Sequence, residues 1–269
     1  MNTPRSTPRG RRRLAAAALL AIIAAKPAAA RKPAEDPVPV AILVYDTQRP
    51  DVCFSEVFLS LVATETTAII EPRLTPLLLP SPALNEAPIA LMTGEGFFEL
   101  TAPQRTALRD WLANGGFLIA SSGCSNHEWA LSFKHEMDEI FHDAPEPRLT
   151  PLPPTHDVFN TIYQIRKLQR TAPPRAADAD LPEPPPTIID ASPLEGLTLN
   201  DRLCVVFTPD GLNDTVSFGG ACCCCGTGEV IQSRQMMANL VAYALAQRAT
   251  QPPPPAQPQN PQPPGTIEP

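Results

Sequence analysis

The sequence predicts an α/β fold, a mostly parallel sheet with helices on both faces, and three observations lead to this class. Residues 88–124 read as one strand–helix–strand unit with a glycine turn at each end of the helix. Short apolar runs alternate with amphipathic segments along most of the chain, which is the order that builds parallel sheets. Once the proline-rich stretches are set aside, roughly 200 residues are left to fold, which suits one domain.

The strand–helix–strand unit is the clearest part of this pattern. An apolar run at residues 89–92 ends in Thr-Gly-Glu-Gly, and a second run at 117–120 ends in Ser-Ser-Gly-Cys. Between them, Thr101 predicts the start of a helix with Pro103 in its first turn, and two glycines after Asn114 predict its end. Because ligands of such folds usually bind at the carboxyl ends of the strands, both run ends are candidate site segments.

The remaining apolar runs complete the predicted sheet and its helices. Buried strands are expected at residues 38–45, 159–168 and 202–207, and a proline-broken edge strand at 69–79. Helices are expected at residues 53–68, 126–141 and 232–246, because apolar residues recur there at helical spacing. In the helix at 126–141 the core-facing residues are Trp129, Phe133, Met137, Ile140 and Phe141.

The first thirty residues have the pattern of a secretion signal. Arg-Gly-Arg-Arg-Arg at 9–13 precedes an apolar run at 14–25, and Ala-Ala-Ala at 28–30 provides a cleavage site. The apolar run is shorter than the ~20 residues of a membrane span, so we expect cleavage, with an uncleaved anchor as the alternative. Residues 1–30 are therefore predicted to be a signal peptide. The mature chain is predicted to be exported, to the periplasm or the extracellular space, with no transmembrane span.

The net charge of the chain indicates which kinds of molecule it can bind. Six of the 21 basic residues and none of the 28 acidic residues lie in 1–30, so the rest of the chain has a net charge of −13. An acidic surface repels nucleic acid and anionic lipid. We therefore expect no nucleic-acid partner, and an envelope protein or a small ligand instead.

Proline is concentrated in two stretches that are not expected to form helices or strands. The chain has 35 prolines among 269 residues, against a usual frequency of about 5%. One stretch, at about 171–188, reads as an inserted loop, and the other, 251–269, as a disordered Pro/Gln-rich tail. The predicted organisation is a single α/β domain at 31–250 followed by this tail.

The motifs, taken together, resemble a known family. MTGEGFFELT, LANGGFLIASSGC and CGTGEVIQSRQMMANLVAYAL, in this order, are similar to the domain of unknown function (DUF) 4159 family of bacterial envelope and secreted proteins. The resemblance implies a relationship to the class I glutamine amidotransferase-like superfamily, and hence a flavodoxin-like fold. It implies no particular reaction. Glu95 stands where the family's glycine motif more often has a histidine.

A nucleophile with a histidine base is one chemistry that a likeness to amidotransferases implies. Cys124 and Ser122 follow a predicted strand, as a nucleophile on a strand-to-helix turn would, and His156 in a later turn is the candidate base. Neither nucleophile stands in a G-x-S-x-G or G-x-C-x-G motif. The alternative is that Ser121, Ser122 and Asn126 cap the helix that follows.

Four consecutive cysteines lie in a glycine-rich loop: Cys222, Cys223, Cys224 and Cys225. Cys222 and Cys225 have the C-x-x-C spacing of zinc or copper ligands, although the sequence has no second such pair. In an exported protein a disulfide is the alternative, and we predict that Cys124 pairs with one of the four. Cys53 and Cys204 lie in apolar surroundings and are expected to be buried free thiols. No other cofactor is predicted.

Polar residues gather where several predicted strands end. The predicted ligand-binding residues are Thr93, Gly94, Glu95, Gly96, Ser121, Asp210 and Asp214. The acids among them, with Asp46, either hold a divalent cation or a cationic ligand or are solvated loop residues. The leading prediction is a non-catalytic ligand-binding or protein-interaction module with its site at this edge. The alternatives are a Cys- or Ser-dependent hydrolase and metal binding by the four-cysteine loop.

Overall fold

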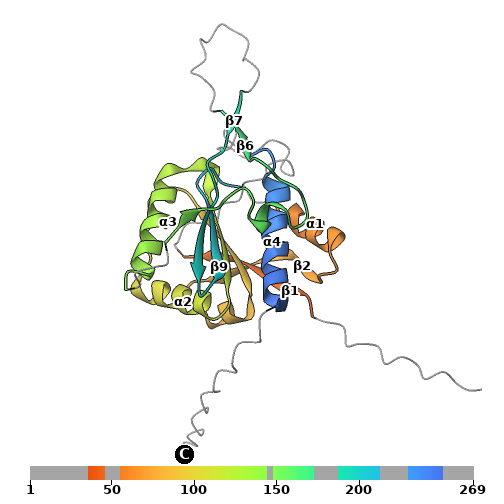
Figure 1. Ribbon diagram of the computed structural model, residues 1–269. Helices are drawn as coiled ribbons and strands as arrows, with labels where there is room; N and C mark the ends of the chain where they lie inside the picture. Colours follow the sequence, from red (N-terminus) through yellow and green to blue (C-terminus); the bar gives the residue numbers. More distant parts are fainter. Residues whose placement is uncertain (1–35, 46–54, 144–147, 173–186, 213–229, 251–269) are drawn as a thin grey trace, which may run out of the picture. The chain divides into compact units, whose positions relative to one another are not determined.

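The computed structural model describes residues 36–45, 55–143, 148–172, 187–212 and 230–250, which form a mixed α/β fold (Figure 1). The strands of its main sheet are β1 (Val38–Val44), β2 (Ile70–Leu78), β3 (Ile89–Gly94), β4 (Phe117–Ser122), β5 (Thr150–Pro151), β8 (Glu195–Leu199) and β9 (Arg202–Thr208). Its helices are α1 (Val57–Glu65), α2 (Ala102–Ala113), α3 (His127–Ile140) and α4 (Ser233–Thr250). A separate antiparallel pair consists of β6 (Gln169–Thr171) and β7 (Ile188–Asp190).

The main sheet is mostly parallel, as the sequence predicts. Its seven strands lie in the order β2-β1-β3-β4-β9-β8-β5. The pairings from β2 to β9 are parallel, whereas β8 is antiparallel to both β9 and β5. The proline-broken segment at 69–79 forms β2 at one edge of the sheet, where missing amide donors are tolerated.

Helices cover both faces of the sheet, and strand alternation divides the core between them. Ile89 and Leu91 of β3 pack with α1 and α4, whereas Ala90 and Met92 pack with α2 and α3. The same alternation holds for β1 and β4, since successive side chains of a strand point to opposite faces. The predicted inward residues Trp129, Phe133, Met137, Ile140 and Phe141 are all buried on the α2/α3 face.

Two helices begin where the sequence predicts them, each because a side chain satisfies its first amides. The Gln104 side chain accepts a hydrogen bond from the Thr101 amide at 2.8 Å, and Pro103 lies in the first turn of α2. The Asn126 side chain accepts from the Trp129 amide at 2.9 Å and caps α3. Both caps also lie next to the candidate site described below.

Two predicted elements need correction. Within the described residues, the helix expected at 53–68 spans only α1, Val57–Glu65. It ends at Glu65 because Thr66 is already extended and its hydroxyl donates back to the carbonyl of Val62. The strand expected at 159–168 is wrong. That segment is a short 3₁₀ turn, Asp157–Phe159, followed by irregular backbone, since its buried residues lack the period of two.

The hairpin of β8 and β9 is an element that the sequence reasoning missed. Asn200 and Asp201 connect the two strands and both have positive φ, at 50° and 60°. A two-residue connection with positive φ at both positions is the turn that fits the twist of a hairpin. The Asn-Asp pair between two apolar runs was the sequence signal for it.

Within the described residues, no helix combines the length and the apolar character that crossing a membrane requires.

Candidate functional site

The candidate site is the carboxyl edge of the sheet between β1 and β3. From β1 the chain first adds β2 on one side and then β3 on the other, so the strand order reverses at β1. Ligands of open α/β sheets bind in the crevice outside the carboxyl ends of the strands at such a reversal. Tyr45 follows β1, and Thr93 to Gly96 end and follow β3.

Gly94 lets two aromatic side chains approach the end of β3. The Tyr45 hydroxyl donates to the carbonyl of Thr93 at 3.0 Å and accepts from Trp129 Nε1 at 2.5 Å. A Cβ at position 94 would lie 2.4 Å from that hydroxyl oxygen and 2.8 Å from Trp129 Nε1. Glycine is therefore required here by close packing.

The loop after β3 is held to α3 by alternate backbone amides. Gly96 N–H donates to the Asn126 side chain at 3.0 Å and Phe98 N–H to Ser132 Oγ at 3.1 Å. The next amide in this alternation, that of Leu100, donates to Glu136 Oε1 at 3.1 Å. Three side chains along one helix thus fix the backbone of residues 96–100.

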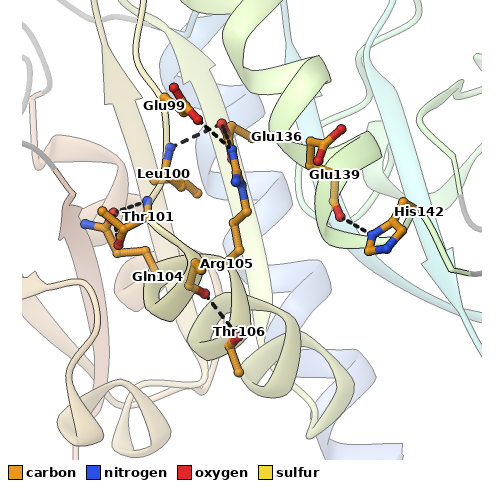
Figure 2. Close-up of polar contacts among 10 residues, drawn as sticks. Glu99, Leu100, Thr101, Gln104, Arg105, Thr106, Glu136, Glu139 and His142 are labelled. Atoms are coloured by element: carbon orange, nitrogen blue, oxygen red, sulfur yellow. Dashed lines mark hydrogen bonds and ion pairs between the residues drawn. The ribbon is translucent and has the colours of Figure 1, made fainter.

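The last of these anchors is a buried carboxylate, and an arginine compensates its charge (Figure 2). Glu136 is fully buried, and Arg105 donates to it twice, from Nε at 2.7 Å and from a terminal nitrogen at 2.9 Å. The hydrogen bond to Glu136 raises the pKa of Arg105 above its usual value. The exposed carboxylate of Glu99 lies 3.5 Å from the same guanidinium. This pair links α2 to α3 beneath the loop.

Gln104 connects the start of α2 to the ends of two strands. Its side-chain nitrogen donates to the carbonyl of Tyr45 at 2.7 Å and to that of Leu79 at 2.8 Å. Its side-chain oxygen accepts from Thr101, as Figure 2 shows. The sequence does not predict Tyr45, Gln104, Arg105, Trp129 and Glu136 as site residues, although Trp129 is correctly predicted to face the core, since nothing in their spacing shows that they meet.

The outward side of the same loop carries two acids and an aromatic ring. Glu95, Phe97 and Glu99 are exposed, while the residues between them point inward or bond to α3. Phe97 is 66% exposed and is the exposed aromatic side chain of this loop. The loop therefore presents a fixed apolar group beside negative charge at the mouth of the site.

The two serines that end β4 bond to backbone groups of this protein. Ser121 Oγ accepts from the amide of Leu212 at 2.8 Å, and Ser122 Oγ donates to the carbonyl of Asn126 at 2.5 Å. Of the three predicted capping residues, Asn126 caps α3 and the two serines bond elsewhere. The backbone of Cys124 belongs to the turn Gly123–Ser125, and its side chain lies outside the described part of the structure.

Asp210 is nearly buried; one carboxylate oxygen accepts a hydrogen bond, and the other lies near a guanidinium without forming one. One oxygen accepts from the amide of Ser192, and the other lies 3.5 Å from Arg170 Nε. Its backbone carbonyl accepts from Ser125 Oγ at 2.6 Å, which joins the end of β9 to the end of β4. The other two acids predicted for this edge, Asp46 and Asp214, lie outside the described residues.

His156 lies on the α1/α4 face of the sheet. Its ring packs on Tyr243 of α4 with centroids 5.6 Å apart, and Tyr243 in turn packs on Phe117 at the start of β4. Burial lowers the pKa of His156, and its Nδ1 accepts from the amide of Val158 at 3.3 Å.

The structure does not bring His156 and Ser122 together. Ser122 follows Leu118 and Ala120 in strand alternation and therefore faces α2 and α3, where its hydroxyl bonds to Asn126. His156 lies on the other face, near the opposite end of β4. The predicted Ser122–His156 pair is therefore not formed.

Only part of the cysteine prediction falls on described residues. Cys204 is a buried free thiol, as predicted, and burial raises its pKa to about 12. Cys53 and the four-cysteine loop, Cys222 to Cys225, lie outside the described part of the structure, as does the predicted disulfide. Among the described residues no three His, Cys, Asp or Glu side chains form a group that could hold a metal ion.

Comparison with known families gives a match to most of the chain. A family model described as "Domain of unknown function (DUF4159)" matches residues 42–245, which include every element from within β1 to within α4. No curated protein matches the chain.

Proposed function

We propose that this protein, which belongs to the DUF4159 family, is an exported, non-catalytic binding module of the cell envelope. Its site is the carboxyl edge of the sheet between β1 and β3, with Thr93, Gly94, Glu95 and Gly96 at the centre. The site continues along the ends of β4 and β9 to Ser121 and Asp210. The proposal also includes Asp214, which lies outside the described residues. Its ligand is a small molecule or a segment of another envelope protein.

The observation that carries this proposal is the fixed loop after β3. Its amides at residues 96, 98 and 100 bond to three side chains of α3, so the loop has little conformational freedom to lose when a ligand binds. Its outward side presents Phe97, and rigid aromatic side chains are the commonest anchors of binding surfaces. A rigid loop with an exposed aromatic ring at a reversal of strand order favours binding.

The polar side chains of this edge favour binding over catalysis. Ser121, Ser122 and Asn126 each bond to backbone groups of the protein. A nucleophile also needs a base within hydrogen-bond reach, and Ser122 and His156 lie on opposite faces of the sheet. A hydrolase that uses Cys124 is the runner-up, and zinc or copper binding by Cys222 and Cys225 is the second alternative.

We also propose that the fold is flavodoxin-like and related to the class I glutamine amidotransferase-like superfamily. Its five parallel strands lie in the order β2-β1-β3-β4-β9, which corresponds to the 2-1-3-4-5 order of that class. Export is proposed from the basic and apolar pattern of residues 1–30 alone, and the acidic remainder of the chain is compatible with an extracytoplasmic protein.

A thermal-shift screen of the mature chain, residues 31–269, tests the proposed function. The library consists of sugars, amino acids, short peptides and other small molecules of envelope chemistry. We expect at least one compound to raise the melting temperature in a saturable way, and Phe97→Ala to abolish the effect. The matched control is Ile188→Ala, which removes another exposed apolar side chain, 57% exposed, from β7, outside the main sheet.

Mass spectrometry of the same compound after incubation separates binding from catalysis. We expect the compound to be recovered unchanged. Turnover by the wild type that Cys124→Ala abolishes would favour the hydrolase. Stabilisation that survives Phe97→Ala, or that is lost equally in Ile188→Ala, would contradict the proposed site.

A further inference from the structure

Three hydroxyl side chains lie in register at the carboxyl edge, one at the end of each of three neighbouring strands. Thr93 of β3 pairs with Ser121 of β4, and Ser121 pairs with Thr208 of β9. All three are buried, with exposed fractions of 1%, 1% and 2%. Each directly follows a run of at least four apolar residues on its strand, so the side chains change from apolar to hydroxyl at the same level of all three strands.

Strand alternation directs the three hydroxyls to one face of the sheet. Ser121 shares the face of Phe117 and Ile119, and Thr93 that of Ile89 and Leu91, which pack against α1 and α4. Thr208 shares the face of Val206, which belongs to the same part of the core. The hydroxyl row therefore faces away from Ser122 and from the Tyr45–Trp129 contact.

Thr93 Oγ1 is buried, and no described residue forms a hydrogen bond with it. A buried hydroxyl without a partner costs about 1–3 kcal/mol, so such groups are rare and call for a specific explanation. A valine would fill the same space in the strand without that cost. The retention of a hydroxyl here points to a partner that is not part of the described chain.

The neighbouring hydroxyl has its proton available for the same partner. Ser121 Oγ accepts the amide proton of Leu212 at 2.8 Å, which leaves its own proton to donate. If the two hydroxyl oxygens are separated by the usual strand spacing of about 4.8 Å, the hydrogen bonds of about 2.75 Å from both to one oxygen meet there at an angle of about 120°. That is the angle between the two lone pairs of an sp² oxygen.

We propose that Thr93 and Ser121 form a subsite that binds an sp² oxygen of the ligand, either of a carboxylate or of an amide carbonyl. Both hydroxyls donate to this one oxygen, and Thr208 extends the polar row beside them. The inference deepens the proposed function, because it assumes that the carboxyl edge binds a ligand. It adds the chemical group that the ligand must carry and the two side chains that recognise it.

Acetate and acetamide are matched probes for the two sources of such an oxygen, since they have the same shape and differ in charge. We would titrate each into the ¹⁵N-labelled mature chain and follow the amide resonance of Leu212, with sodium chloride as the ionic control. Donation by Ser121 to a probe strengthens its hydrogen bond from Leu212, so this resonance reports on the subsite. We expect a saturable shift with acetate if the group is a carboxylate, and with acetamide if it is an amide.

Three variants decide whether Thr93 is responsible. Thr93→Val, which keeps the shape and removes the hydroxyl, is expected to weaken probe binding at least tenfold, and Thr93→Ser to retain it. The matched control Thr106→Val removes an exposed hydroxyl that bonds within α2 and should leave binding unchanged. Without a probe, Thr93→Val should melt at or above the wild-type temperature, because it removes an unpaired buried hydroxyl.

Several outcomes would overturn the subsite. They are the absence of any saturable shift in the wild type, a shift that survives Thr93→Val, or a melting temperature several degrees lower in Thr93→Val. The last would mean that the chain itself or an ordered water already binds the hydroxyl. If stabilisation by a library compound were lost in Phe97→Ala but kept in Thr93→Val, the subsite would be wrong and the proposed function would still hold. Failure of all compounds in the Phe97 screen would overturn the proposed function as well.

Discussion

The segments at residues 95–101 and 156–165 both lie outside the strands and α-helices, and side chains of a helix or its cap hold each of them, yet in different ways. Asn126, Ser132 and Glu136 each bind one amide of the first segment from α3. A single residue, Asn239 of α4, binds the second. Its oxygen accepts from the amides of residues 162 and 163, and its nitrogen donates to the carbonyl of residue 163.

The difference indicates which segment is built to present a surface. Three separate anchors keep residues 95–101 in place along their length and leave Phe97 outward and exposed. One buried asparagine fixes only the middle of the other segment, whose apolar residues Val158, Phe159 and Ile165 are buried in the core. Anchors spread along a segment keep its exposed side chains in place, as a binding surface requires. A single anchor is enough for a segment whose apolar side chains are buried in the core.

The largest expected effect is that of Asn239→Leu. Asn239 is fully buried, and its replacement leaves three backbone groups without a partner, so the free energy of unfolding should fall by about 3–4 kcal/mol. Urea denaturation measures this. Gln247→Leu in the same helix, where the amide makes one weak contact at 3.3 Å, should cost less than about 0.5 kcal/mol. If Asn239→Leu lowered the free energy of unfolding by less than about 1 kcal/mol, Asn239 would not be the main anchor of residues 156–165.

Arg105→Met tests the charged anchor of the other segment and should cost about 3 kcal/mol. The change leaves the fully buried Glu136 carboxylate without its compensating charge. Arg109→Met, one turn further along α2, breaks an exposed ion pair of 3.7 Å and should cost less than about 0.5 kcal/mol.

A second substitution distinguishes loss of charge compensation from loss of packing. Adding Glu136→Leu to Arg105→Met removes the unpaired buried charge and should recover part of the lost stability. If the double variant were instead less stable than Arg105→Met, the buried carboxylate would be acting mainly through the Leu100 amide.

Gly96→Val tests the backbone of the presented loop itself and should cost about 1–2 kcal/mol. Gly96 has a φ of +72°, and a Cβ there would meet nothing within 4 Å, so the cost comes from backbone conformation and not from a clash. Gly96→Ala should cost less than Gly96→Val, because φ above zero is hardest for a β-branched residue. Equal stability of wild type and Gly96→Val would show that the loop can turn without this conformation.

The two segments also differ in how far the sequence predicts them. The strand ends, the helix caps and the turn glycines around residues 89–122 depend on local rules, and the structure agrees with them. The strand expected at 159–168 failed because Asn239, far along the chain, supplies the hydrogen bonds that a neighbouring strand would otherwise supply. Local pattern does not reveal a partner 77 residues away.

The candidate site follows the same rule. The sequence predicts Thr93, Gly94 and Ser121 because they end strands, and strand ends share an edge once the sheet is parallel. It does not predict Arg105 with Glu136, or Tyr45 with Trp129, because these pairs depend on how α2 and α3 pack on the sheet. The predicted Ser122–His156 pair is not formed, because both residues were chosen for lying near turns. That choice did not take into account which face of the sheet each side chain points to.

The smallest effect concerns the segment held by Asn239, and it depends on pH. Burial lowers the pKa of His156 below its ordinary value of 6.5, and the nearby Asp157 opposes this only in part. The unfolded chain therefore takes up the proton first as the pH falls. The stability contributed by neutral His156 is complete above about pH 6.5 and is lost as the pH falls toward the folded pKa.

His156→Asn isolates this contribution. Asparagine can still accept from the amide of Val158, as His156 Nδ1 does, but it does not titrate. In urea denaturation near neutral pH the variant should be less stable than the wild type only by the ring contact with Tyr243, a loss that does not depend on pH. Between about pH 8 and about pH 5.5 the wild type should lose more stability than the variant. Because the 95–101 segment contains no histidine, Gly96→Val should keep the wild-type pH dependence, and an altered dependence there would mean that the two segments are coupled.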